Sequence, residues 1–214
     1  MSSLKPPSVV EKAAGNLPVE AALTVIAAAA GAPLTALLPV LAKSLASERQ
    51  KQRVEATLRE MNEVLLKHVA LLATLTDQQY KFINEAVLAL LHTTNENKMG
   101  FLRNVVHNGL HASELPDQEA VFLSRVIRDI SAEEAQFLIS NFGYERIWLN
   151  ESDYGGSELS TLAVKPSTPA GQVALGLLTL GVLATAEPTW GDSGLLRFTP
   201  FAAKVIALLR KPDA

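Results

Sequence analysis

Between residues 46 and 75 the chain places an apolar residue alternately every four and every three positions. An α-helix turns once in 3.6 residues, so this spacing lines up one side of a single long amphipathic helix. The seam covers three heptads and suits either an intermolecular coiled coil or one helix of an intramolecular bundle. The bundle is favoured because more helices follow. The seam residues are Val54, Leu58, Met61, Leu65, His68, Leu72 and Leu75.

Several further helices are predicted after this one, with short connections between them. The stretches 76–79 and 131–134 have the spacing of capping boxes, in which a hydroxyl and a Glu or Gln bind each other's backbone amides. A helix at about 96–108 is expected to end at Gly109 as its C-cap, and Pro116 to open the next one. Aromatic residues make up only 6% of the chain, which favours helix over sheet. The fold class is predicted to be mainly α, a multi-helix bundle.

The last region of the chain changes character after an irregular stretch at 142–157. Thr168-Pro169 and Thr199-Pro200 each read as an N-cap followed by a proline at the first helical position. Between these two helices, the runs 184–190 and 195–199 are strand-like and flank the turn Gly191-Asp192-Ser193-Gly194. This order of helix, strand, turn, strand and helix resembles the wing half of a winged-helix domain. It predicts a winged-helix-like unit that contains one β-hairpin.

The charges of this unit argue against binding of nucleic acid, although the resemblance alone implies it. The helix in the recognition position, about 169–183, has no Lys or Arg, and its polar side chains are Gln172 and Thr179. The wing offers Arg197 as its cation, beside Glu187 and Asp192. Because contacts to phosphate supply much of the affinity for DNA, a partner protein or the bundle itself suits this apolar helix better.

An uncharged apolar segment, residues 21–42, precedes the helical region. It has the length of a membrane span, but Gly31, Pro33 and Pro39 interrupt it and alanine is only weakly apolar. Two short helices at about 18–30 and 34–46, buried in the bundle or in an oligomer interface, are therefore favoured over membrane insertion. The chain is expected to divide into residues 1–46, 47–142 and 158–214. A cytoplasmic location is expected, because no basic region leads directly into the apolar run, with membrane association as the alternative.

Two motifs resemble catalytic or metal sites. His107 and His111 have the spacing of two zinc ligands on a helix, with Glu114 as the nearest third ligand. Gly109, however, is expected to end the helix between them, so no metal site is predicted. Ser193 lies in a sequence spelled like the nucleophile loop of serine proteases, but no histidine follows His111. The tip of a hairpin explains Gly-Asp-Ser-Gly better.

The other candidates have structural explanations. His68 on the heptad seam is interpreted as a packing residue. Glu133 and Glu134 lie where a helix N-terminus favours negative charge. The glycines at 155–156 lack the Gly-Lys-Ser/Thr continuation of a phosphate loop, and the absence of cysteine excludes disulfides and thiolate metal sites. No catalytic residue, cofactor or metal ligand is therefore assigned.

The order of an apolar segment, a charged helix, a bundle and a winged-helix-like tail resembles bacterial proteins of the abortive-infection alpha kind. That resemblance implies a role in stress or phage defence. The leading hypothesis is a non-enzymatic protein that acts through protein–protein contacts and self-association. A membrane-active protein that inserts residues 21–42 and a winged-helix DNA-binding regulator are the alternatives.

Overall fold

The computed structural model of the protein describes residues 48–112, 116–151, 160–186 and 194–212. The chain divides into two compact units. The first comprises Met1–Arg128 with Pro212–Ala214, and the second is Asp129–Lys211. The predicted helices at 18–30 and 34–46, and with them the apolar segment 21–42, lie outside the described residues. Among the described helices, none is long and apolar enough to cross a membrane.

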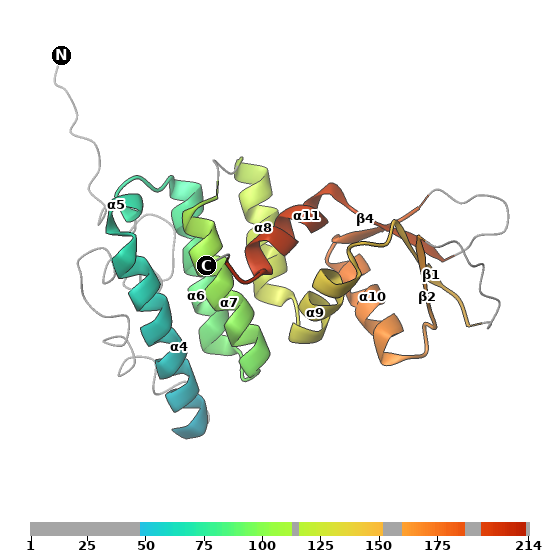
Figure 1. Ribbon diagram of the computed structural model, residues 1–214, viewed down its shortest axis with the longest axis horizontal. Helices are drawn as coiled ribbons and strands as arrows, with labels where there is room; N and C mark the ends of the chain where they lie inside the picture. Colours follow the sequence, from blue (N-terminus) through green and yellow to red (C-terminus); the bar gives the residue numbers. More distant parts are fainter. Residues whose placement is uncertain (1–47, 113–115, 152–159, 187–193, 213–214) are drawn as a thin grey trace, which may run out of the picture. The chain divides into compact units, whose positions relative to one another are not determined.

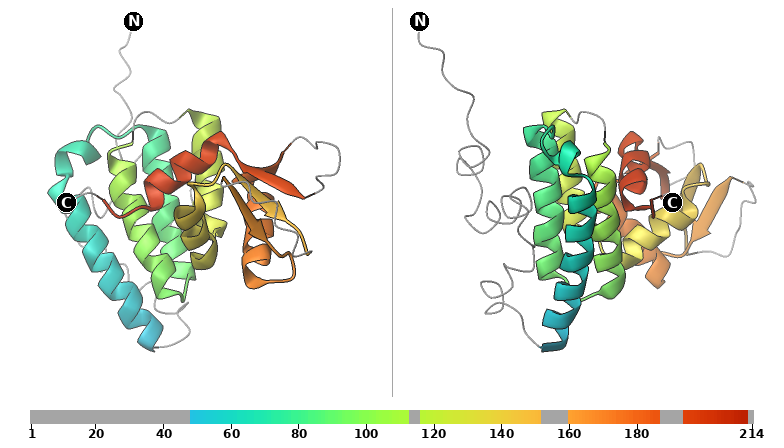
Figure 2. Two further views of the ribbon diagram at one scale, coloured as in Figure 1. Left: turned by 45° about the vertical axis from the view of Figure 1, so that its right-hand side comes forward. Right: turned by 60° about the vertical axis from the view of Figure 1, so that its left-hand side comes forward.

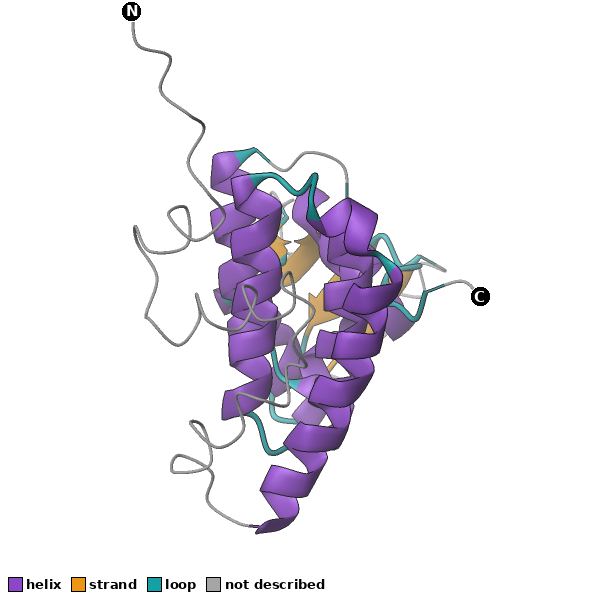
Figure 3. Ribbon diagram, turned by 90° about the vertical axis from the view of Figure 1, so that its left-hand side faces the viewer, coloured by secondary structure: helices purple, strands orange, loops and turns teal. Residues whose placement is uncertain are grey.

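The described portion of the first unit is built from helices alone (Figures 1 and 3). Helix α7 packs against both α4 and α6 (Figure 2). This confirms the helical bundle that the sequence predicts. The helices are α4 (Glu48–Lys67), α5 (Val69–Leu72), α6 (Asp77–His92), α7 (Glu96–Leu110) and α8 (Asp117–Asp129).

The heptad seam is confirmed in α4 and is interrupted at its fifth position. Its first four residues, Val54 to Leu65, are at most 1% exposed. At His68 the backbone leaves the helical region, with φ −118° and ψ 31°, and its carbonyl accepts the amides of both Leu71 and Leu72. The single helix expected up to residue 75 is thus two helices joined at His68. The spacing of the seam residues predicts which side of a helix is buried. It does not show that the backbone turns at His68, because this turn adds no residue to the spacing.

Helices α4 and α7 run parallel and in register. Arg53 contacts Glu96, with 2.7 Å between Nε and Oε1, and Glu60 contacts Arg103. Both pairs have the same sequence offset, since 96 − 53 and 103 − 60 are each 43. Exposed ion pairs of this kind contribute little free energy, on the order of 0–1 kcal/mol. Burial of the apolar side chains of α4 is therefore expected to stabilise this unit more than the two ion pairs do.

The two predicted capping boxes are confirmed, but the predicted end of α7 is wrong. Both capping boxes form, with Thr76 Oγ1 accepting the Gln79 amide at 3.2 Å and Ser131 Oγ accepting the Glu134 amide at 3.1 Å. Helix α7, however, continues through Gly109 to Leu110. A Cβ on Gly109 would lie 3.2 Å from Phe82 Cε1 of α6. The glycine serves the close approach of two helices rather than a helix end.

The second unit combines three helices with a four-stranded sheet of order β2-β1-β4-β3. Strands β1 and β2 are parallel, and β4 pairs antiparallel with both β1 and β3. The predicted hairpin is confirmed as β3 and β4. The elements are α9 (Ala132–Asn141), β1 (Arg146–Leu149), β2 (Thr161–Val164), α10 (Pro169–Thr179), β3 (Leu183–Thr185), β4 (Leu195–Phe198) and α11 (Pro200–Leu209).

Strand β1 lies inside the stretch 142–157 that the composition marks as irregular. It has only four residues, too few for an alternating pattern to show, and it is paired on both sides by β2 and β4. The boundary between the two units accordingly falls after Arg128, and not within 142–157. The turn residues 191–193, Ser193 included, lie outside the described residues.

Helix α10 has well-defined ends. The Thr168 hydroxyl accepts the Gly171 amide at 3.3 Å, with Pro169 at the first helical position, as predicted. At the other end the amide of Gly181 donates to the carbonyl of Leu178, and the amide of Val182 donates to the carbonyl of Leu177. Gly181 has φ 73°. This is a Schellman motif, which requires the left-handed backbone that glycine adopts most easily. The apolar face of α10 packs against α9 and β3 in its own unit. Thr199, predicted as an N-cap, precedes α11 without a side-chain cap, because its hydroxyl donates to the carbonyls of Gly181 and Val182.

The close contact at Gly109 predicts opposite outcomes for one substitution at two positions of α7. Gly109→Val is expected to destabilise the protein by about 1–3 kcal/mol, because the added methyl groups overpack the contact with Phe82. Gly100→Val is the matched control, since a Cβ there meets nothing within 4 Å. Urea unfolding followed by circular dichroism measures both. Equal stability of the two variants would contradict the packing role of Gly109.

Candidate metal centre

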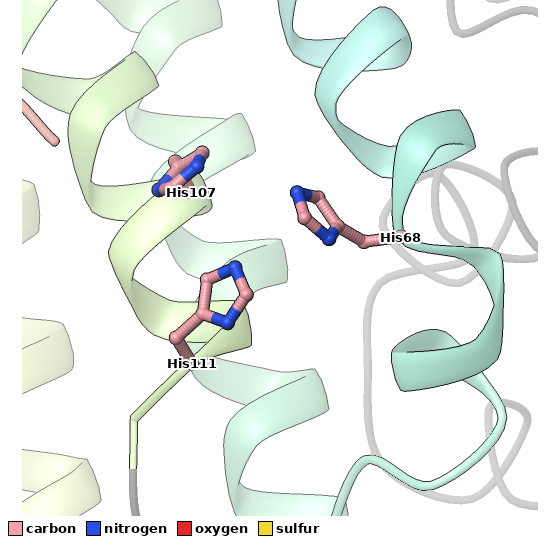
Figure 4. Close-up of side chains that lie close together, drawn as sticks. All are labelled: His68, His107 and His111. Carbon is pink, nitrogen blue, oxygen red and sulfur yellow. The ribbon is translucent and has the colours of Figure 1, made fainter. Parts of the chain in front are cut away.

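Three of the four histidines of the chain meet in the first unit (Figure 4). His107 lies in the last turn of α7 and His111 is the C-cap of that helix. His68 lies opposite them, at the junction of α4 and α5. Because α7 continues through Gly109, His107 and His111 lie one turn apart on the same side of the helix. His68 lies at the level of His111 because the two residues differ by 43 in number, the same offset as in the two ion pairs between α4 and α7.

The imidazole rings are close enough to share one ion. One ring nitrogen from each histidine lies within 4.8 Å of the other two. The ring centroids of His68 and His111 are 4.8 Å apart, those of His107 and His111 are 5.2 Å apart, and those of His68 and His107 are 5.7 Å apart. Three nitrogens on a tetrahedral zinc ion are roughly 3.3 Å apart, given Zn–N bonds of about 2.0–2.1 Å. The side chains would have to rotate toward a common point to bring the nitrogens to that separation.

The surroundings of His68 favour its neutral form, which is the form that binds a metal. Burial lowers the pKa of His68 below its ordinary value of 6.5, and the positive charges of His111, His107 and Lys67 lower it further. In the neutral form one of its two ring nitrogens has a lone pair that can bind a metal.

A hydrogen-bond partner can fix which nitrogen of His107 faces the ion. Its Nδ1 lies 3.3 Å from Oδ1 of Asn108. When Nδ1 donates to that oxygen, Nε2 is left unprotonated and free to bind a metal. An outer partner of this kind is what orients most histidine ligands in proteins.

The three histidines form a ligand set that leaves the ion unsaturated. Within the described residues, no Asp or Glu joins the group of close ligand atoms. A zinc ion held by three imidazoles keeps a fourth position for water or another ligand. His111 is exposed and the other two rings are half-buried, so this position is accessible from solvent.

Two surface hollows of the first unit are lined by other described residues. One, of about 330 Å³, lies between α6 and α8 and includes Lys81 and Asp117 in its lining. The other, of about 340 Å³, lies between α4 and α7 around Thr57 and Gly100. No histidine lines either of them. The cluster is therefore an open site at the end of the α4–α7 contact.

The sequence indicated this cluster only incompletely. The spacing of His107 and His111 was recognisable, but the expected helix end at Gly109 separated them. His68 was interpreted as a packing residue, and its partners were missed because they follow only from the register of α4 against α7. Glu114, the nearest possible third ligand in the sequence, lies outside the described residues.

The remaining candidates are not members of the histidine group. His92 is the exposed last residue of α6. Glu133 and Glu134 lie in the first turn of α9, where Glu134 completes the capping box as predicted. Arg197 lies on β4, paired with Arg146 of β1 in the sheet register.

Comparison of the chain with protein families, with curated proteins and with solved structures finds no match. The resemblance to abortive-infection proteins therefore stays a prediction, and the site has to be judged from its own geometry.

The lowered pKa of His68 predicts how the metal-free protein responds to acid. The unfolded chain, whose imidazole titrates near 6.5, takes up a proton before the folded chain does. The free energy of unfolding is therefore higher above pH 6.5, and it decreases as the pH falls from 6.5 toward the lower pKa of His68 in the folded chain. His68→Gln removes this contribution, so its melting temperature is expected to fall less than that of the wild type between about pH 7.5 and 5.5.

Thermal melts in the presence of a chelator measure this effect. His92→Gln is the matched control, because it removes an exposed histidine outside the cluster. Identical pH profiles for the wild type and His68→Gln would show that the surroundings of His68 do not favour its neutral form.

Proposed function

We propose that the first unit is a metal-binding module that holds one transition-metal ion, of the zinc type, through His68, His107 and His111. One observation carries the proposal: three imidazoles from two separate helical segments present ring nitrogens within 4.8 Å of one another. The neighbouring rings also disfavour a proton on His68, and the neutral imidazole is the form that binds a metal.

The chemistry of the ligands selects the class of metal. Imidazole nitrogen suits Zn²⁺, Cu²⁺, Ni²⁺ and Co²⁺, whereas Mg²⁺ and Ca²⁺ require oxygen ligands. The sequence has no cysteine that would add thiolate. The module is therefore expected to discriminate strongly between these two classes of divalent cation.

The position of the ligands suggests what the ion does for the protein. His107 and His111 belong to the end of α7, and His68 is the turn residue where α4 gives way to α5. One ion would thus fix the α4–α5 junction against α7. Helix α5 has no buried residue of its own, so little else among the described residues holds this junction. A structural role of this kind agrees with a non-enzymatic protein that works through contacts with other proteins.

Metal binding is expected to require His68, His107 and His111 and to be independent of His92. Titration of the purified full-length chain with Co²⁺ should produce visible d–d absorption that saturates at one ion per chain, and Zn²⁺ should displace it. Single substitutions His68→Ala, His107→Ala and His111→Ala should each weaken binding at least tenfold. His92→Ala is the matched control and should bind like the wild type.

Zinc should also raise the melting temperature, since a ligand at 100 times its dissociation constant stabilises the folded state by about 2.7 kcal/mol. Mg²⁺ at the same concentration should have no such effect. Loss of binding in His92→Ala, or retention of full affinity in all three cluster variants, would refute the assignment.

A further inference from the structure

One side of α6 is buried, yet its polar groups have no partner among the described residues. Tyr80, Asn84, Val87 and Leu91 follow one another at spacings of four, three and four, so they form one stripe along the helix. Asn84 and Val87 are at most 1% exposed, and Leu91 is 8% exposed. The hydroxyl of Tyr80 and both amide atoms of Asn84 are buried and make no hydrogen bond to any described residue. These four residues are here called the α6 stripe.

The two polar groups of the α6 stripe require hydrogen-bond acceptors. A buried donor without a partner carries the full cost of its lost hydration, so buried polar groups in proteins nearly always have a partner. Burial raises the pKa of Tyr80 above its ordinary value of 10.0, so the hydroxyl keeps its proton and stays a donor. The amide of Asn84 is a second donor, one helical turn away. The α6 stripe therefore offers two apolar side chains and two donors.

The described helices that border α6 lie on its other sides. Helix α7 approaches Phe82 and Ile83, where Gly109 is close to both. Helix α8 borders α6 at Gln78 and Lys81. At 100° per residue, each of these two pairs is centred roughly 120° around the helix from the α6 stripe. Helix α4 makes its main backbone contacts with α7. The sides of α6 that α7 and α8 occupy are thus different from the stripe.

The chain has a segment of matching chemistry ahead of α4. Residues 21–42 carry no charged side chain and are mostly Ala and Leu. Pro33 and Pro39 lack a backbone amide, so a helical turn that contains either of them leaves one carbonyl without its usual donor. A segment with apolar side chains and free carbonyls complements a stripe with apolar side chains and free donors.

The segment is also close enough to reach the α6 stripe. Arg53, near the start of α4, contacts Glu96 at the start of α7, and α6 ends four residues earlier at His92. Helix α4 therefore begins at the end of the bundle where α6 finishes. Asn84 lies about 12 Å along α6 from that end, whereas residues 21–42 would span about 33 Å as a helix. A tethered segment at such a short distance has a high effective concentration, which favours it over a separate chain.

We propose that the apolar segment 21–42 docks on the α6 stripe of its own chain, and that the side-chain amide of Asn84 donates to a backbone carbonyl that Pro33 or Pro39 leaves free. Docking in this way gives a buried donor its acceptor and removes the apolar segment from water. It also leaves the segment unavailable to a membrane or to a second copy of the chain. The proposal does not depend on the metal site.

Disulfide trapping in the full-length chain tests where the segment lies. The chain has no cysteine of its own, so two introduced cysteines form disulfides only with each other, within one chain or between chains. Val87→Cys on the α6 stripe is combined in turn with single cysteine substitutions at positions 28 to 41. At least one pair is expected to form a disulfide within one chain under mild oxidation. Lys81→Cys, on the exposed side of α6, is the matched control and should form none with the same set.

Substitution of Asn84 tests the hydrogen bond by the sign of its effect. Asn84→Leu keeps a similar shape and removes the amide. When the amide donates to the segment, this change leaves a buried carbonyl unpaired, and the melting temperature is expected to fall by about 2–4 °C. An amide without a partner would give the opposite sign, because the change would then remove an unsatisfied group. In a background of Pro33→Ala with Pro39→Ala the fall should be smaller, since the carbonyls regain helical donors.

Each outcome decides between this docking and an alternative. Disulfides that form only between two chains would overturn the proposal in favour of a second copy. No disulfide with Val87→Cys at any position, or the same pattern with Lys81→Cys, would overturn it in favour of another location for the segment, a membrane included. A melting temperature that rises or stays unchanged in Asn84→Leu, as a buried water alone would allow, would overturn the hydrogen bond from Asn84.

Discussion

The constraint on which the first unit depends is the register of α4 against α7. Four seam residues of α4 are at most 1% exposed, and the burial of such side chains contributes on the order of 1.5–3 kcal/mol each. The two helices are parallel and keep an offset of 43 residues from Arg53–Glu96 to Glu60–Arg103. That register continues to the end of α4, where it brings His68 to His111.

The position of α7 depends in turn on α6. Gly109 lets α7 approach Phe82 and Ile83 closely enough that any side chain at that point would crowd them. A residue that looks like a helix end is instead a packing residue, and the helix that continues through it keeps His107 and His111 together. One small residue therefore decides both how the helices pack and whether the histidines can act as a group.

The second unit contains the hairpin and helices that the sequence pattern predicts. The hairpin of β3 and β4 and the helices on either side of it are those that the winged-helix-like pattern predicts. Helix α10 packs its apolar face against α9 and β3. The absence of Lys and Arg from α10 agrees with this packing, because burial of a charged side chain is costly.

The sequence by itself determined what depends on neighbours along the chain: the helical class, the two capping boxes, the proline-started helices, the hairpin strands and the inward side of α4. Each of these reflects backbone hydrogen bonding or periodicity within a few residues. Only the tertiary structure decided what depends on register between distant segments. The strand β1 exists because β2 and β4 pair with it, and α7 continues through Gly109 because α6 lies against it. The proposed metal centre is of the same kind, since no local pattern records that residues 68 and 111 occupy the same level of two parallel helices.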